Sequence, residues 1–176
     1  MERYKKMCCY LTIAVVVLSL ALIGTYNFYQ TKQNNELLLI SSKAHMPYKT
    51  NIVSETENNT NYRKVLFTGA RSQLVVMDIP PGGEVGEETH KYVEQTLFFL
   101  SGVGKAVLDG KESPIVAGDV VVVPPGTKHN FINTGTSSLK IYTVYAPPNH
   151  IDGRIHATKA DADKDAADEA VGEQMR

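Results

Sequence analysis

Apolar residues are spaced in two different ways along the chain, and each spacing predicts a different kind of structure. Residues 10–29 form one uncharged, largely apolar run. At about 1.5 Å per helical residue, that run matches the ~30 Å hydrocarbon core of a bilayer. Residues 62–156 instead alternate short apolar runs with glycines and prolines. The first spacing predicts a membrane-spanning helix, and the second predicts an all-β sandwich or barrel.

The apolar run favours a retained signal-anchor. Residues 1–9 before it are basic, with Arg3, Lys5 and Lys6 against Glu2. By the positive-inside rule, the N-terminus is then expected in the cytoplasm and the β-rich block outside it. A cleaved signal peptide, which would leave a secreted chain, is the main alternative, although no clean small-residue cleavage signal follows Ile23. A buried core helix is a third interpretation.

The β-rich block has the signals of several antiparallel strands. Its apolar runs are Gln73 to Ile79, Thr96 to Leu100, Val103 to Leu108, Val120 to Val123 and Leu139 to Tyr145. Asp109-Gly110 after one of these runs predicts a tight hairpin. No helix-length periodic stretch and no phosphate-binding glycine loop occurs in the block. A nucleotide-binding α/β fold is therefore excluded.

Two polar segments flank this block. Residues 30–61 are rich in asparagine and show little periodicity, so we expect a polar tether there. Residues 157–176 form an acidic, alanine-rich tail. Thr158 can cap a short helix in it, with Asp161 in the first turn and Gly172 at its end. Because its apolar face is small, we expect this helix to be weakly docked or solvated.

Composition removes several classes of function. The chain has 176 residues, and its 18 basic and 19 acidic residues give a net charge of −1. Such a balance offers no electrostatic footprint for nucleic acid, so no nucleic-acid partner is expected. The only cysteines are the neighbours Cys8 and Cys9, which excludes a disulfide scaffold and a cysteine-ligated zinc finger.

Two histidine-containing stretches carry the candidate chemistry. His129 stands in a run from Gly118 to Asn133 that fits the pattern G-x5-P-x-G-x2-H-x3-N at every fixed position. His90 stands in a run from Gly82 to Gly102 that fits G-x5-HxH-x3,4-E-x6-G in part. These are the two motifs of cupins, and residues 62–156 resemble small single-domain cupins of the mannose-6-phosphate-isomerase-like subgroup. The resemblance implies a double-stranded β-helix barrel with a metal inside its mouth.

The first motif departs from the family at two positions. Glu88 replaces the first histidine, and Gln95 takes the place of the glutamate, because the x6-G spacing to Gly102 selects Gln95 over Glu94. Glu94 would then point outward, since a one-residue slip reverses a strand side chain. The resemblance thus implies the metal ligands Glu88, His90, Gln95 and His129.

That donor set suits a divalent ion such as Fe, Mn, Zn, Ni or Co. His90 as an ordinary strand-edge residue, and Gln95 as a hydrogen-bonding group in the pocket, are the alternatives. Two more histidines, His150 and His156, follow the last predicted strand, and His156 is expected at the surface. A role for His156 as an acid or base over the barrel mouth is the less favoured interpretation.

Function is less determined than fold, because cupins host many reactions. The leading hypothesis is a membrane-tethered cupin that binds or acts on a small polar molecule, sugar-like or an oxygenated acid. The metal would act as a Lewis acid, and Glu88 would handle a proton. A non-catalytic ligand-sensing or scaffold domain and an Fe(II) oxygenase are the alternatives. Apolar side chains on both faces of Leu97 to Leu100 also predict a homodimer.

Overall fold

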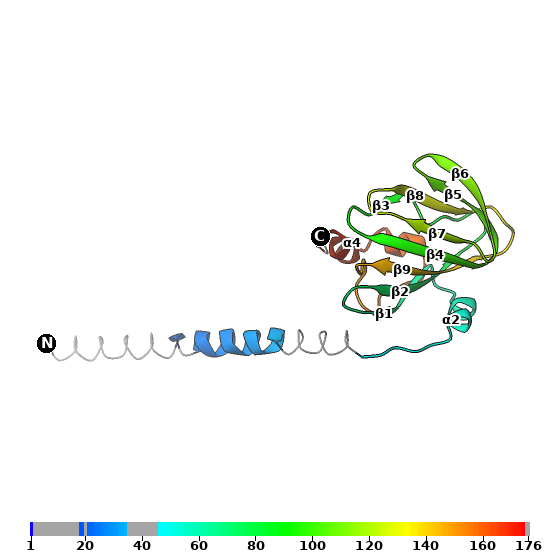
Figure 1. Cartoon of the computed structure of the whole chain (residues 1–176). Coiled ribbons are helices and arrows are strands. Elements are labelled where there is room, and N and C mark those ends of the chain that lie inside the picture. The colour runs from blue at the N-terminus through cyan, green and yellow to red at the C-terminus, as the bar shows by residue number, and fades with distance from the viewer. Residues whose placement is uncertain (2–17, 20, 35–45, 175–176) are drawn as a thin grey trace. The chain divides into compact units, whose positions relative to one another are not determined.

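The computed structural model describes residues 1, 18–19, 21–34 and 46–174 (Figure 1). The chain divides into two compact units, Met1–Lys43 and Ala44–Arg176. The second unit contains every strand of the described residues and both predicted motifs, so the site is built within it.

Ten antiparallel strands form two sheets in this unit. The six-stranded sheet has the order β10-β1-β2-β9-β4-β7, and the four-stranded sheet has the order β3-β8-β5-β6. The strands of the first sheet are β10 (Ile155–His156), β1 (Arg63–Thr68), β2 (Gln73–Ile79), β9 (Leu139–Ala146), β4 (Glu94–Ser101) and β7 (Val120–Val123). Those of the second sheet are β3 (Glu88–Thr89), β8 (Lys128–Asn133), β5 (Val103–Leu108) and β6 (Lys111–Val116). The predicted all-β architecture is confirmed.

The core lies between the inner faces of these sheets. Along β9, every second residue from Leu139 to Tyr145 is buried, which is the period of a strand with one face inward. Phe99 from the first sheet and Phe131 from the second meet inside, with ring centroids 5.5 Å apart. The residues between the buried positions face outward, so the alternation seen in the sequence sets which side chains can reach an internal site.

The predicted hairpin at Asp109-Gly110 is present between β5 and β6. Both residues have positive φ, 48° and 78°. This left-handed backbone is what a two-residue turn with the twist of the strands requires, and it explains the choice of Asp-Gly.

Part of the segment expected as a polar tether is folded. Helix α2 (Ile52–Asn58) begins at Asn51, whose side chain accepts a hydrogen bond from the Ser54 N–H. Thr56 of this helix is fully buried, and the ammonium of Lys140 on β9 donates to the Asn59 carbonyl. These contacts are made with strands distant in sequence, so the local lack of periodicity did not reveal them.

The C-terminal segment is helical, as predicted, but it is firmly docked. Thr158 caps α3 (Lys159–Ala162) through a capping box with Asp161. A second helix, α4 (Ala166–Gln174), follows and contains Gly172 instead of ending there. The prediction of a weakly docked or solvated helix is wrong. Asp168 of α4 is only 2% exposed, because its carboxylate accepts hydrogen bonds from His150 and from the Ile151 N–H of the β-domain.

The prediction of a membrane-spanning helix is not supported. In the part of the chain that the structure describes, no helix is both long enough and apolar enough to cross a bilayer. The described helical stretch 21–34 ends in the polar run Gln30 to Asn34, and residues 10–17 and 20 of the predicted span lie outside the described residues. The predicted location, a single-pass membrane protein with an extracytoplasmic barrel, is contradicted by this finding.

Candidate metal centre

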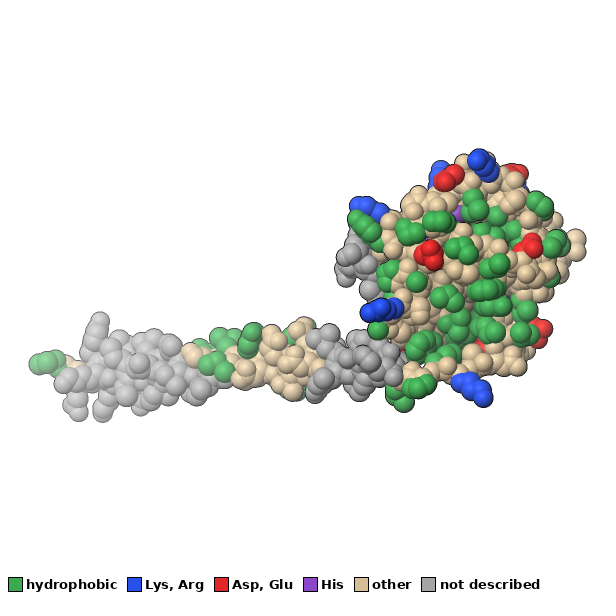
Figure 2. All heavy atoms as spheres, in the orientation of Figure 1, with side chains coloured by type: hydrophobic (Ala, Val, Ile, Leu, Met, Phe, Trp, Pro, Cys, Tyr) green, Lys and Arg blue, Asp and Glu red, His purple; other side chains and the backbone are tan. Residues whose placement is uncertain are grey.

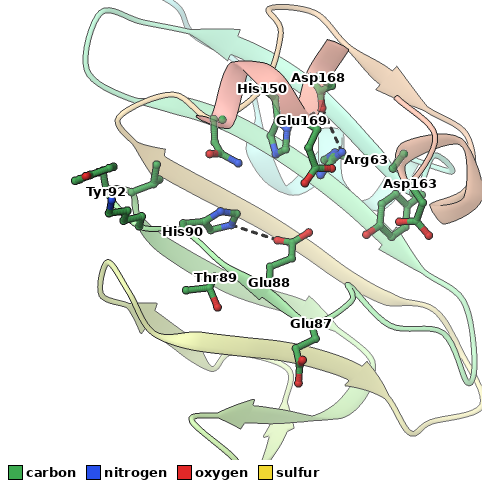
Figure 3. A pocket seen from close by; sticks show the side chains of 16 residues that line it. Arg63, Glu87, Glu88, Thr89, His90, Tyr92, His150, Asp163, Asp168 and Glu169 are labelled. Carbon is green, nitrogen blue, oxygen red and sulfur yellow. Dashed lines mark hydrogen bonds and ion pairs between the residues drawn. The ribbon is translucent and has the colours of Figure 1, made fainter. Parts of the chain in front are cut away.

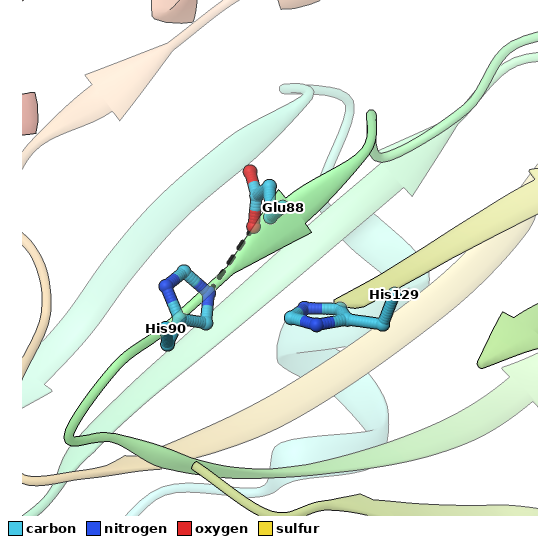
Figure 4. A group of neighbouring side chains, drawn as sticks. All are labelled: Glu88, His90 and His129. Atoms are coloured by element: carbon cyan, nitrogen blue, oxygen red, sulfur yellow. Dashed lines mark ion pairs between the residues drawn. The ribbon is translucent and has the colours of Figure 1, made fainter. Parts of the chain in front are cut away.

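Three side chains with metal-binding atoms come together where β3 and β8 pair. Glu88 lies opposite His129 in the register of these strands, and His90 follows directly after β3. One ligand atom from each residue lies within 4.8 Å of the other two (Figure 4). His90 Nε2 is 3.2 Å from Glu88 Oε2. The group has the donor types of a divalent transition-metal site.

The turn before β8 fixes the distance between the two motifs. Gly126 in this turn has φ +83°, a conformation that favours glycine. Its N–H donates to the His90 carbonyl over 2.8 Å. This hydrogen bond ties the end of the first motif to the start of the second. The rings of His90 and His129 consequently lie with their centroids 5.2 Å apart.

The second motif holds His129 with one ring nitrogen free. Its Nδ1 lies 2.9 Å from the Thr127 carbonyl, which can only accept, so Nδ1 carries the proton. Nε2 is then left with a lone pair, and among the described residues it has no hydrogen-bond partner although it is buried. A backbone carbonyl that fixes the tautomer of a histidine in this way is a usual support for a metal ligand.

Gln95 places a second unsatisfied acceptor in the interior. The residue is fully buried on β4, whereas its neighbour Glu94 is exposed, so the strand alternation is as the x6-G spacing predicts. Its amide nitrogen donates to the Thr143 hydroxyl over 3.2 Å. Gln95 Oε1 has no partner within the described residues. Buried carbonyl oxygens rarely stay unbonded, so this atom is suited to a ligand outside the protein chain.

The electrostatics favour the protonation states that a metal needs. Burial raises the pKa of Glu88, but the hydrogen bond with His90 and the positive charge of Arg63 outweigh it, so the pKa is lowered. Burial lowers the pKa of His129, against the raising effect of the Thr127 carbonyl. At neutral pH the cluster therefore presents a carboxylate and a neutral imidazole.

A cavity of about 290 Å³ lies beside this cluster. Glu88 and His90 form part of its wall with their chain neighbours, and residues from β1, the segment after β9, α3 and α4 also line it (Figure 3). The volume is sufficient for a small molecule. The wall is polar, with Arg63, His150, Asp168 and Glu169 among its side chains.

Comparisons with known proteins identify the family of the chain. The family model described as "Cupin domain" matches residues 75–145. The uncharacterized protein YrkC of Bacillus subtilis is 39% identical over 132 residues, which cover 71% of this chain and 70% of that relative. The chain belongs to the cupin family. The crystal structure of BH2720 from Bacillus halodurans superposes on this cupin with a TM-score of 0.66 and 35% identity, covering 67% of this chain and 94% of that one.

A third relative is named by its ligand. The oxalate-binding protein of Thermotoga maritima is 37% identical over 68 residues, covering 39% of this chain and 56% of that relative.

The family match and the superposition confirm the predicted cupin barrel. The structure brings together Glu88, His90 and His129, and it places Gln95 inside the barrel on the neighbouring sheet.

Sequence reasoning missed one wall of the cavity. The prediction of a surface position for His156 is wrong, because its side chain is only 4% exposed, and His150, to which the sequence assigns no role, is only 6% exposed. His150 Nδ1 donates to Asp168 Oδ2 over 2.9 Å, and Arg63 Nη2 reaches the same oxygen over 3.2 Å. These residues lie 18 and 105 positions from Asp168, so no local spacing links them. The Pro147-Pro148-Asn149 run before His150 indicates a turn and nothing more specific.

Proposed function

We propose that this cupin binds a divalent metal ion through Glu88, His90, Gln95 and His129, and binds or acts on a small polar molecule in the adjacent cavity. The observation that carries this proposal is the pair of buried, unpartnered acceptors, His129 Nε2 and Gln95 Oε1, together with the Glu88 and His90 pair. Unsatisfied buried acceptors are costly unless a ligand takes up their lone pairs.

The donor set fits Fe, Mn, Zn, Ni or Co, and it contains one formal negative charge. When bound, such an ion would supply Lewis-acid polarisation of a ligand oxygen. Glu88 is the carboxylate of the cluster that also lines the cavity, so we assign to it the transfer of a proton to or from the bound molecule. Arg63, His150 and Glu169 would orient the molecule from the opposite wall.

The class of molecule is supported by the cavity and by one relative. A cavity of about 290 Å³ with a polar wall suits a small sugar-like molecule or an oxygenated acid. The Thermotoga maritima relative carries the name of an oxalate-binding protein, which favours oxygen-rich ligands.

Metal analysis of the purified full-length chain tests the proposal. The protein would be loaded separately with each of the five ions, desalted and measured by mass spectrometry of the elements. We expect a single ion per chain for at least one metal. Failure to retain any divalent ion under every loading condition would remove the metal-dependent function and leave a metal-free ligand-binding or scaffold role.

Gln95→Glu should tighten metal binding. This substitution introduces a second carboxylate among the proposed ligands, and an added anionic oxygen strengthens the attraction for a divalent cation. The measurement is a competition titration with a chelator. Glu94→Gln is the matched control, because Glu94 is exposed on the same strand and should leave the affinity unchanged. If Glu94→Gln loses the metal while Gln95→Glu has no effect, the assignment of Gln95 is wrong.

An apolar face covers the outside of the six-stranded sheet. Phe98 and Tyr142 stack there with ring centroids 4.7 Å apart. Val120 and Val122 on the edge strand β7 are 53% and 52% exposed. Figure 2 shows apolar side chains gathered over this side of the domain. We propose that a second copy of the chain covers this face, because it continues to an edge strand with unpaired backbone groups that an identical strand can complement.

Val122→Lys should therefore convert a homodimer to a monomer. A buried lysine without a partner opposes association, whereas the exposed wild-type valine favours it. Light scattering across micromolar concentrations measures the mass. Val116→Lys, a 51% exposed valine on β6 of the other sheet, is the control and should remain dimeric. A wild-type chain that is monomeric at all these concentrations contradicts the proposed face.

A further inference from the structure

The cavity beside the metal cluster has two chemically different walls. One wall carries the proposed ligands Glu88 and His90. The other carries His150 from the segment after β9 and Asp168 and Glu169 from α4 (Figure 3). A small molecule held between the two walls must suit both of them.

Most carboxylates of the cavity are already neutralised by a cation. Asp168 pairs with Arg63 over 3.2 Å. Glu87 pairs with Lys128 over 2.7 Å, and Asp163 pairs with Lys159 over 2.8 Å. The charge of Arg63 is thus balanced by Asp168. The other cation of the wall, Lys91, directly follows His90 and lies over the Tyr92 ring, 4.9 Å from its centroid, so it belongs to the wall that carries the proposed ligands.

Glu169 differs from these carboxylates. Among the described residues, no cation forms an ion pair with it, and its side chain is exposed. In Figure 3 it extends from α4 toward the side of the cavity where Glu88 and His90 lie. A carboxylate can only accept hydrogen bonds, so this position attracts a donor or a positive charge.

His150 adds a second acceptor to the same wall. Its Nδ1 donates to the Asp168 carboxylate, and its Nε2 has no hydrogen-bond partner within the described residues although the side chain is more than nine-tenths buried. Burial lowers the pKa of His150, against the raising effect of Asp168, which favours the neutral ring with a lone pair on Nε2. The Asp168 carboxyl group is held in turn by the Ile151 N–H over 2.8 Å, so the ring is fixed in this orientation.

We infer that the small molecule bound by this cupin carries a hydroxyl or ammonium group at the end facing α4, where Glu169 and His150 accept hydrogen bonds from it. Its other end offers an oxygen to the metal cluster. Polyols, hydroxy acids and amino acids meet this requirement. A dicarboxylate does not, because its second carboxylate would meet two acceptors. Oxalate, for which the Thermotoga maritima relative is named, is a dicarboxylate, so the inference separates the ligand of this chain from that of the relative. This inference rests on the proposed function and narrows its ligand class.

Matched probes with one carboxylate and a variable far end test the inference. They are malonate, 3-hydroxypropionate and β-alanine, with the four-carbon set succinate, 4-hydroxybutyrate and 4-aminobutyrate. Each is titrated by calorimetry into the metal-loaded full-length protein. We expect a hydroxyl- or ammonium-ended probe to bind about tenfold more tightly than the dicarboxylate of the same length, as one charge-assisted hydrogen bond would provide.

Variants locate the preference on α4. Glu169→Gln should abolish most of the advantage of the ammonium-ended probe and improve binding of the dicarboxylate. Glu87→Gln is the matched control, since Glu87 also lines the cavity but is paired with Lys128, and it should preserve the order of the probes. Thermal unfolding of both variants verifies that they are folded.

The outcomes separate this inference from the proposed function. Metal content is measured first, and a chain that retains no metal overturns the proposed function itself. A metal-loaded chain that binds the dicarboxylates as tightly as their hydroxyl and ammonium counterparts, or binds none of the probes at millimolar concentration, overturns the inference while the metal site stands. An unchanged order of the probes in Glu169→Gln overturns the role of Glu169.

Discussion

His129→Ala should lower the affinity for divalent metal ions by more than about 100-fold. Loss of a group that merely supports a metal ligand already costs about 10–100-fold, and His129 is itself the proposed ligand with a free Nε2. Equilibrium dialysis followed by elemental analysis measures the loss. The tight β3 and β8 pairing around this residue should persist, because alanine keeps the backbone register.

Lys128→Ala provides the control on the same strand. Lys128 is the neighbouring residue, its side chain is exposed, and it pairs with Glu87 at the surface. The substitution should therefore leave metal content unchanged. If His129→Ala retained a full equivalent of metal with wild-type affinity, His129 would not be a ligand.

Asp168→Asn should destabilise the fold by about 3–5 kcal/mol, the usual cost of leaving a buried charged partner unpaired. Asp168 is 2% exposed, and its carboxylate accepts from His150, Arg63 and the Ile151 N–H. An amide can accept fewer of these bonds and carries no charge to balance Arg63. Chemical denaturation of the full-length chain gives the free energy of unfolding.

The matched control is Asp163→Asn on the same C-terminal segment. Asp163 forms an exposed i,i+4 pair with Lys159, and such pairs contribute only about 0.3–0.5 kcal/mol. A loss below about 1 kcal/mol for Asp168→Asn would contradict the view that this carboxylate fastens α4 to the domain.

Asp168 should also make the free energy of unfolding decrease as the pH is lowered. Burial raises the pKa of Asp168, but the hydrogen bonds from His150 and the Ile151 N–H and the charge of Arg63 lower it further, to about 2. Because the folded pKa lies below the unfolded value of about 3.9, the stabilisation is present above that value and is lost as pH falls toward 2. Its size is roughly 2–3 kcal/mol. Between pH 5 and pH 2 the free energy of unfolding should therefore fall less steeply with pH for Asp168→Asn than for the wild type, as measured by chemical denaturation at each pH.

Local sequence patterns were sufficient to predict the strands and the residues at the centre of the candidate site. The alternation of buried residues and the Asp109-Gly110 turn are local properties of the backbone, so they could be recognised in the sequence. The motif around His129 works in the same way, since Gly126 and Thr127 act within three residues of the ring they position. The spacing from Gln95 to Gly102 identified the buried residue because a strand turns alternate side chains to opposite faces.

Long-range contacts decided the rest. The membrane-spanning interpretation of residues 10–29 rested on local hydropathy and flanking charge, and no described helix supports it. Helix α2 looked like a tether because its buried contacts are with strands far along the chain. The wall formed by His150, Asp168 and Glu169 exists only after α4 folds back onto the barrel. The sequence by itself therefore determined the barrel and the residue types that line its interior. Tertiary structure alone decided which residues form the opposite wall of the cavity. The burial and the charge pairing of that wall depend on residues that no periodicity in the sequence connects.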